Sequence, residues 1–298
     1  MNDSYKSQAE LVLETLPEVA KEECFALHGG TAINLFFRDM PRLSVDIDLT
    51  YVPISDRESS LSDIVRALKE IEKRLKKNKP GIVTNLKEES LKLLLSFNHA
   101  QIKLEVNQIN RGCLAKIENR VLCDRAQDIF DAFCEVNIVP YSQLFGGKII
   151  AALDRQHPRD LFDIKYLIEE NRINNDIKPG FILCLLSSSR PFFELLNPNK
   201  KDQRQAFENQ FEGMSLEPFS YDDFEKTRDK LIVQVNSLLN KEDKAFILNF
   251  KKLVPEWNLY DFGDFPAVKW KLKNLSDFKA NNEIAYNTAI DRLASFLD

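Results

Sequence analysis

The sequence is poor in the residues that hold together small secreted domains or zinc-dependent proteins. Of its 298 residues, only five are cysteine and three are histidine. The cysteines are odd in number, scattered and never in a CxxC pair, which excludes a disulfide framework and a zinc knuckle as organising features. His28, His99 and His157 are too far apart for ligands on one zinc-binding helix. We expect reduced and mostly buried thiols.

Long apolar runs and a large excess of one charge are also missing. Hydrophobic residues make up 44% of the chain, yet no run approaches the roughly 20 residues that span a bilayer. The first ten residues are polar and show no secretory leader, so we expect a cytoplasmic protein without membrane contact. The net charge of −5 means that a nucleic-acid partner would need a local basic patch. Two basic clusters are candidates, at residues 73–79 and 269–273.

Periodicity divides the chain into a mixed half and a helical half. The expected helices of the first half are 4–16, 32–38 and 62–77, and its expected strands are 25–27, 43–52, 82–86, 91–97, 101–109 and 130–139. After Pro140 the pattern is helical, over residues 141–154, 159–170, 180–187, 221–240, 241–253 and 281–297. The sequence therefore predicts an α+β protein, with a mixed sheet flanked by helices in domain 1–139 and a helical domain 140–298.

The first chemical motif combines a glycine turn with two aspartates. Gly29, Gly30 and Thr31 follow a short strand, and Thr31 is expected to cap the next helix, so the backbone N–H groups and the threonine hydroxyl can bind phosphate. Asp46 and Asp48 alternate on an otherwise apolar strand, where two like charges are costly without cations. Alone, the turn is typical of a capped helix and Asp-x-Asp of an exposed strand. Together they predict phosphate and metal binding, and hence nucleotidyl transfer.

A third carboxylate is expected from a neighbouring strand. Two-metal transfer needs carboxylates that hold ions about 3.5–4 Å apart. Glu105 lies on a strand that could pair beside Asp46 and Asp48, and Lys103 two residues earlier could instead neutralise phosphate. Mg²⁺, or Mn²⁺ in its place, is the expected ion because it prefers carboxylate and phosphate oxygens, and an NTP is the expected substrate.

A second constellation follows Pro140. Lys148 lies in a Gly-Gly-Lys string that is not a P-loop, since the upstream glycine and the following Ser or Thr are absent. Its cation could reach the β- and γ-phosphates of a nucleotide between the two domains. Asp160 and Asp163 share a helix face, beside Arg159. Arg159 and these aspartates also fit an ordinary charged helix start with an internal ion pair.

These motifs, in this order, resemble the AbiEii/AbiGii toxin family, nucleotidyltransferase-like proteins of the DNA polymerase β superfamily. The resemblance runs nearly end to end and includes looser matches at residues 255–257 and 265–271. It implies a bilobed nucleotidyltransferase that is the toxin of a type IV toxin–antitoxin or abortive-infection pair, with a separately encoded antitoxin not held in a stable complex.

The resemblance also implies roles for single residues. Gly29, Gly30 and Thr31 would bind the triphosphate with Lys148, and Asp46 and Asp48 would bind the metals. Glu105 joins them as the expected third ligand, and Asp160 or Asp163 would assist the acceptor hydroxyl. Some relatives modify the tRNA 3′ end, so tRNA is the first acceptor to consider. Two alternatives stay open: a small-molecule nucleotidyltransferase of the antibiotic-resistance type, and a non-enzymatic nucleotide-binding module.

Overall fold

The computed structural model describes residues 3–298, which form two compact units. The first contains the chain up to Pro140 and, after a long excursion, Gln205–Phe219. The second contains Tyr141–Arg204 and Ser220–Asp298. Each unit is described by itself below. Within residues 3–298, no helix combines the length and apolarity needed to cross a membrane.

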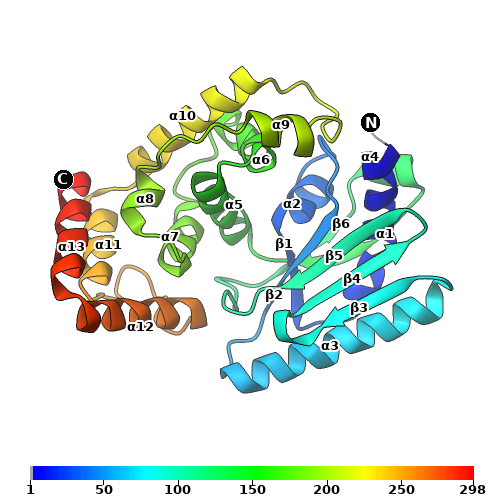
Figure 1. Ribbon diagram of the computed structural model, residues 1–298, viewed down its shortest axis with the longest axis horizontal. Helices are drawn as coiled ribbons and strands as arrows, with labels where there is room; N and C mark the ends of the chain where they lie inside the picture. The colour runs from blue at the N-terminus through cyan, green and yellow to red at the C-terminus, as the bar shows by residue number, and fades with distance from the viewer. Residues whose placement is uncertain (1–2) are drawn as a thin grey trace. The chain divides into compact units, whose positions relative to one another are not determined.

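A seven-stranded mixed sheet organises the first unit, and Figure 1 shows its strands. β2 pairs in parallel with β5, β1 pairs in parallel with β7, and the other neighbouring strands are antiparallel. The order is β3-β4-β5-β2-β1-β7-β6. The bounds are β1 (Phe25–His28), β2 (Asp46–Tyr51), β3 (Val83–Lys87), β4 (Lys92–Phe97), β5 (Ala100–Val106), β6 (Glu118–Val121) and β7 (Glu135–Ile138).

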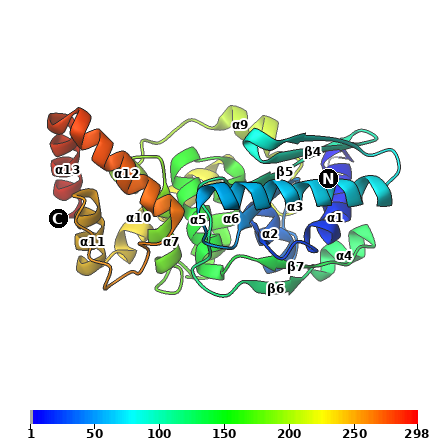
Figure 2. The same cartoon turned by 90° about the horizontal axis from the view of Figure 1, so that it is seen from below.

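The two faces of this sheet differ in polarity because side chains alternate along each strand. Ile47, Leu49 and Leu104 are buried on one face, which is covered by α1 (Asp3–Val19) and α3 (Arg57–Asn78). Figure 2 shows α3 running the length of the sheet, and Thr84 of β3 donates a hydrogen bond to Glu72 of α3 at 2.6 Å. The opposite face carries the charged residues of β2 and β5.

Several local elements differ from the sequence prediction. α1 continues to Val19 through Pro17, which costs one backbone hydrogen bond while the helix keeps Leu16 and Val19 buried. The sequence pattern predicts no helix or strand over residues 118–129, but this segment forms β6 and most of α4 (Asp124–Phe130). The predicted strand 130–139 is confirmed only over β7, and the short 3-10 turn η2 (Glu88–Ser90) joins β3 to β4.

The helix after the glycine pair begins earlier than predicted. Gly29 has a positive φ of 73°, and α2 (Gly29–Ala32) starts at this residue with His28 at the N-cap. Thr31 therefore lies inside the helix, and the prediction that it is the cap is wrong. The helix continues as a π-helix, η1 (Ile33–Phe37), closed by a hydrogen bond from Arg38 N–H to Ile33 O of 2.9 Å. π-turns of this kind are frequent at functional sites.

Gln205–Phe219 returns to the first unit and completes it. Hydrogen bonds from Leu43 N–H to Met214 O and from Leu216 N–H to Pro41 O, at 2.9 and 2.8 Å, pair it with the lead-in to β2. The aromatic rings of its three phenylalanines pack together (Phe207, Phe211 and Phe219). The strand that carries Asp46 and Asp48 is thus secured by a segment that lies more than 150 residues later in the sequence.

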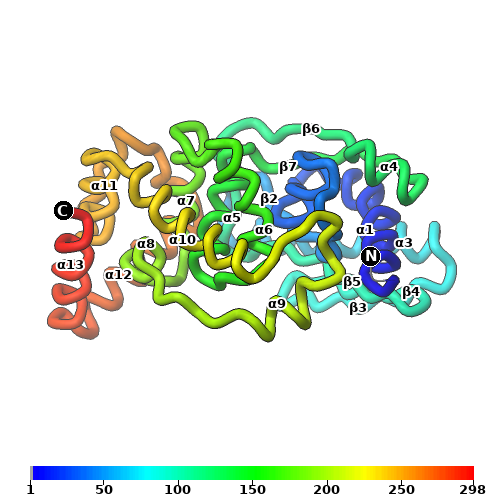
Figure 3. The backbone as a smooth tube through the Cα atoms, turned by 90° about the horizontal axis from the view of Figure 1, so that it is seen from above, coloured from blue at the N-terminus to red at the C-terminus, as the bar shows by residue number. Residues whose placement is uncertain are grey.

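The second unit is helical, as predicted from the sequence. Its helices are α5 (Tyr141–Arg155), α6 (Pro158–Glu169), α7 (Lys178–Ser187), α8 (Phe192–Leu196), α10 (Tyr221–Leu238), α11 (Lys241–Lys251), α12 (Pro266–Asn281) and α13 (Glu283–Leu297), and α9 (Arg204–Gln210) follows where the chain leaves the unit. α10 lies beside α6, as Figures 1 and 3 show. α8, α9 and α12 were not predicted. The α+β class, with a sheet followed by a helical region, is confirmed.

Two glycines let α5 and α7 pack closely. A Cβ on Gly146 would lie 2.3 Å from the backbone carbon of Gly180, and one on Gly180 would lie 1.9 Å from the Ser142 carbonyl oxygen. No side chain fits at these distances, so the backbones are in direct contact. Gly146, the first residue of the Gly-Gly-Lys string, is therefore explained by helix packing.

Candidate active site

Four charged residues lie side by side on the polar face of the first unit. In the parallel pair of β2 and β5, Asp46 lies opposite Lys103 and Asp48 lies opposite Glu105. Partners in register point to the same face of a sheet. All four side chains are half-buried, whereas Ile47 between the two aspartates is fully buried. The alternation seen in the sequence and the neighbouring position of Glu105 are both present.

The glycine turn lies directly against the second aspartate. A Cβ on Gly29 would lie 2.6 Å from Asp48 Oδ2, so the absence of a side chain allows this close approach. A Cβ on Gly30 would lie 2.7 Å from Nη2 of Arg42, whose side chain is 3% exposed. Arg42 was not predicted, although it shares the alternation of Ser44, Asp46 and Asp48. A buried guanidinium thus lies beside the turn.

Thr31 connects the turn to the aspartate strand. Its hydroxyl hydrogen-bonds the backbone carbonyl of Asp46 and contacts Ser44 Oγ at 2.9 Å. The residue is 1% exposed. In this arrangement the hydroxyl fixes the start of β2 relative to the turn, and the phosphate-binding role expected for it stays a prediction.

Glu105 is held between two lysines. Its Oε1 lies 3.1 Å from Lys92 Nζ and its Oε2 lies 2.8 Å from Lys103 Nζ. Burial raises the pKa of Glu105, but the hydrogen bonds and charges of Lys103 and Lys92 outweigh it and hold the pKa below its ordinary value. Burial lowers the pKa of Lys103, and Glu105, Asp46 and Asp48 together raise it above its ordinary value. Glu105 and Lys103 therefore hold each other in their charged forms at neutral pH.

The donor set suits a divalent cation only in part. Asp46 and Asp48 offer two carboxylates on one strand, which is the chemistry that Mg²⁺ prefers. Across the described residues 3–298, no three His, Cys, Asp or Glu side chains are gathered into a ready metal-binding group. Both oxygens of Glu105 contact lysines. The aspartate pair fits the ion, and Glu105 could join it only if it released a lysine.

The second constellation is compact and buried. Lys148 of α5 is 7% exposed, and its Nζ lies 3.1 Å from Asp160 Oδ1 and 2.9 Å from Asp163 Oδ2. Asp160 also contacts Arg155, with 2.9 Å between Oδ2 and Nη2. Burial raises the pKa of Asp160, but the charges of Lys148 and Arg155 outweigh it and hold the pKa below its ordinary value. Lys148 is thus neutralised by two carboxylates.

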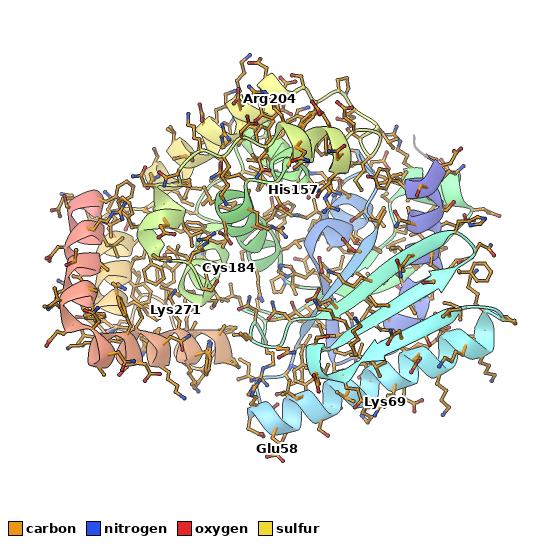
Figure 4. The ribbon with its side chains drawn as sticks, in the orientation of Figure 1. Glu58, Lys69, His157, Cys184, Arg204 and Lys271 are labelled. Carbon is orange, nitrogen blue, oxygen red and sulfur yellow. The ribbon has the colours of Figure 1, made fainter. Side chains whose placement is uncertain are left out.

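The start of α6 places these aspartates. His157, labelled in Figure 4, is the N-cap, and its Nδ1 accepts a hydrogen bond of 3.2 Å from the Arg159 N–H. Pro158 follows in the first turn, where a missing N–H costs nothing. The Arg159 side chain is half-exposed. The predicted site residues therefore form two sets. The first set, in the first unit, contains Gly29, Gly30, Thr31, Asp46, Asp48, Lys103 and Glu105, and the second set, in the second unit, contains Lys148, Arg159, Asp160 and Asp163.

Neither basic cluster noted in the sequence is a simple cationic surface. In the first, Arg74 contacts Glu22 at 2.8 Å and Lys79 contacts Glu14 at 2.8 Å. In the second, Lys271, labelled in Figure 4, is 9% exposed and donates to the Ser188 and Arg190 carbonyls at 2.6 and 2.9 Å. Burial and the charge of Lys251 lower the pKa of Lys271 to about 8. Arg74, Lys79 and Lys271 are therefore neutralised or buried and do not offer a free cation to a polyanion.

Comparisons with known proteins agree with this architecture. The model of a protein family described as "Nucleotidyl transferase AbiEii toxin, Type IV TA system" matches residues 11–274. Among solved structures, the chain is similar to MenT4, the nucleotidyltransferase toxin Rv2826c from Mycobacterium tuberculosis H37Rv. The TM-score is 0.62 and the identity 12%, over 91% of this chain and 93% of that chain, which shows a shared fold. No curated protein matches the sequence.

Proposed function

Because the chain belongs to the AbiEii family of nucleotidyltransferase toxins of type IV toxin–antitoxin systems, we propose a metal-dependent transfer that uses Asp46 and Asp48. In this proposal the chain transfers a nucleoside monophosphate from an NTP to an acceptor hydroxyl. The observation that carries it is the polar face of β2 and β5, where two aspartates lie beside Glu105 and against Gly29. A separately encoded antitoxin follows from the family, and we propose that the toxin acts in the cytoplasm.

The residues of the first set divide the work. Asp46 and Asp48, with Glu105 as a third ligand once it leaves Lys92 or Lys103, would hold Mg²⁺ or Mn²⁺, which supplies charge neutralisation of the triphosphate. The backbone of Gly29 and Gly30 would bind the outer phosphates. The acceptor oxygen bonds to the α-phosphorus, the bond from that phosphorus to the β-phosphate oxygen breaks, and pyrophosphate leaves. The hydroxyl proton passes to water.

We propose that residues 1–139 form the nucleotidyltransferase domain and that the second set supports the reaction from a helical domain, residues 140–298. Lys148 and Arg159 are the proposed phosphate-binding cations, and Asp160 or Asp163 the carboxylate that assists the acceptor hydroxyl. Because Lys148 is buried between both aspartates, its role in binding requires that it exchange a carboxylate for phosphate. The proposed acceptor is the 3′ end of tRNA.

Transfer of label from an α-labelled NTP to total tRNA tests this function. Asp46→Asn and Asp48→Asn should each lower the rate at least about a hundredfold, because each removes a metal-binding charge without changing side-chain size. Asp128→Asn, on the exposed side of α4, is the matched control and should transfer normally. EDTA should abolish the reaction, and added Mg²⁺ should restore it. Undiminished transfer by the Asp46 and Asp48 variants would rule out this mechanism.

A further inference from the structure

Lysines continue the charged row beyond the proposed metal site. Glu105 lies opposite Lys92 of β4, and Lys92 lies opposite Lys87 of β3. Paired residues of antiparallel strands point to the same face, so this row extends from Asp48 to the edge of the sheet. We call Lys87, Lys92 and Lys103 the lysine track. Neither Lys87 nor Lys92 belongs to the motifs that the sequence presented.

The lysine track is partly exposed to solvent, and the residues around its outer end are mostly uncharged. The Lys92 and Lys103 side chains are 34% and 36% exposed, and Lys87 is exposed at the sheet edge. The residues beside the lysine track on β3 and β4 are uncharged: Val83, Asn85, Leu94 and Ser96. Glu105 is the acid that contacts the lysine track. Lys92 and Lys103 therefore share one contacting carboxylate, and Asp46 and Asp48 lie beside Lys103 at the inner end of the lysine track.

At the sheet-edge end of the lysine track, the neighbouring acids lie in the turn between β3 and β4. Glu88 is directed to the opposite side of the sheet, where its Oε1 lies 2.7 Å from Nζ of Lys69 on α3, labelled in Figure 4. Glu89 is exposed in the same turn. With Glu88 paired to Lys69, and with the charges of Asp46 and Asp48 assigned to the metal ions of the proposed function, the three lysines outnumber Glu89 and Glu105.

Strand order gives the lysine track a definite place in the proposed reaction, on which this inference rests. The Gly29–Gly30 turn follows β1, on one side of Asp48, and Glu105 and Lys92 lie on the other side. In an in-line displacement, the acceptor approaches opposite the leaving pyrophosphate. With the outer phosphates at the glycine turn, the acceptor must approach from the β5 and β4 side.

We propose that the lysine track binds the phosphodiester backbone of a nucleic-acid acceptor strand and guides its terminal hydroxyl toward Glu105. Lysines neutralise phosphates without regard to sequence. Lys87 and Lys92 lie one strand apart, at a backbone spacing of about 4.8 Å, so both can contact one phosphodiester backbone. A cationic acceptor such as an aminoglycoside would be repelled by the same surface. The lysine track therefore separates the two kinds of acceptor that the family motifs alone leave open.

Binding of fluorescent single strands to the full-length protein tests the proposal. The probes are an RNA and a DNA oligonucleotide of one sequence, titrated without NTP at several salt concentrations. Lys87→Glu is the informative variant because Lys87 contacts none of the proposed metal ligands. It should raise the Kd about tenfold for at least one probe and reduce the log–log salt slope by about 1, since about one phosphate contact is lost. Lys92→Gln should act in the same direction.

Lys73→Glu is the matched control. This lysine is 76% exposed on α3, which covers the opposite face of the sheet, and it makes the same change of charge. It should leave the Kd unchanged. Equal Kd values for Lys87→Glu and Lys73→Glu, with both probes, would overturn the proposal.

NTP binding and transfer in the same variants separate this proposal from the proposed function. If Asp46→Asn transfers normally while Lys87→Glu loses strand binding, the metal mechanism fails and the surface remains a nucleic-acid site. If transfer requires Asp46 but Lys87→Glu binds the single strands with an unchanged Kd, the mechanism stands and the lysine track is not the acceptor site. The two failures are therefore distinguishable.

Discussion

The two units contain ion clusters in which the positive and negative charges are exchanged. In the first, one carboxylate, Glu105, lies between two lysines, and in the second one lysine, Lys148, lies between two carboxylates. The Glu105 side chain is 32% exposed and that of Lys148 only 7%. Water can replace a lost partner in the open cluster but not in the buried one. The open cluster is therefore the easier one to rearrange around a substrate, and an exchange of partners in the buried cluster costs more.

Removal of one lysine from each cluster should give the largest contrast. Lys148→Met leaves Asp160 and Asp163 buried without their shared cation, which should lower the free energy of unfolding by about 3–5 kcal/mol. Lys92→Met breaks a half-exposed pair and should cost about 1 kcal/mol or less. Urea denaturation followed by circular dichroism measures both. Similar losses in the two variants would contradict the distinction between open and buried clusters.

The open cluster also depends on a glycine, and replacing it tests function more than stability. Gly29→Ala should cost about 1–2 kcal/mol because φ is 73° there, and the new methyl group should displace the Asp48 carboxylate. Gly81→Ala is the matched control: φ is 91°, but its Cβ would meet only Phe97, at 3.8 Å. Both variants should lose similar stability in urea, and only Gly29→Ala should lose nucleotide transfer. Normal transfer by Gly29→Ala would show that Asp48 tolerates displacement.

The smallest expected effect is the acid response of the buried cluster. The folded-state pKa of Asp160 lies below its ordinary value of 3.8, so the carboxylate stabilises the fold fully above pH 3.8 and progressively less below it. The difference in unfolding free energy between the wild type and Asp160→Asn should therefore shrink below pH 3.8, by at most about 1.4 kcal/mol per pH unit. Guanidinium titrations from pH 7 to 2.5 measure it. A constant difference over this range would contradict the assignment.

Local patterns predicted the parts of the site that depend on one strand or one turn. The alternation of Asp46 and Asp48 fixed their common face, and the order strand, glycine turn, helix, strand is confirmed. Glu105 could be placed beside them because β5 was recognised as a separate strand. Lys92 could not, because its position opposite Glu105 depends on the register of the β4–β5 hairpin. Register is set by turn geometry and by packing of the whole sheet.

The sequence pattern did not predict β6 and α12, whose inward-facing positions include polar residues. Along β6, half-buried residues alternate with exposed ones and none is fully buried, so the strand has no apolar face that the sequence pattern could reveal. On α12 the buried positions include Lys271 beside Ala267 and Leu275, and this lysine hides the helical repeat. α2 starts at Gly29, which has a positive φ and no room for a side chain beside Asp48, and neither feature has a local sequence signal. The return of Gln205–Phe219 to the first unit has no local signal at all.

The position of Gln205–Phe219 in the sequence determines when the first unit can be completed during translation. The first unit lacks its last part until Phe219 has been synthesised, 79 residues after Pro140. At about 5–20 residues per second, this delay lasts roughly 4–16 s on the ribosome. During that interval, Pro41 O and Leu43 N–H, close to the strand of Asp46 and Asp48, still lack their partners. The nascent chain therefore carries both aspartates before the segment that secures the lead-in to β2 has been made.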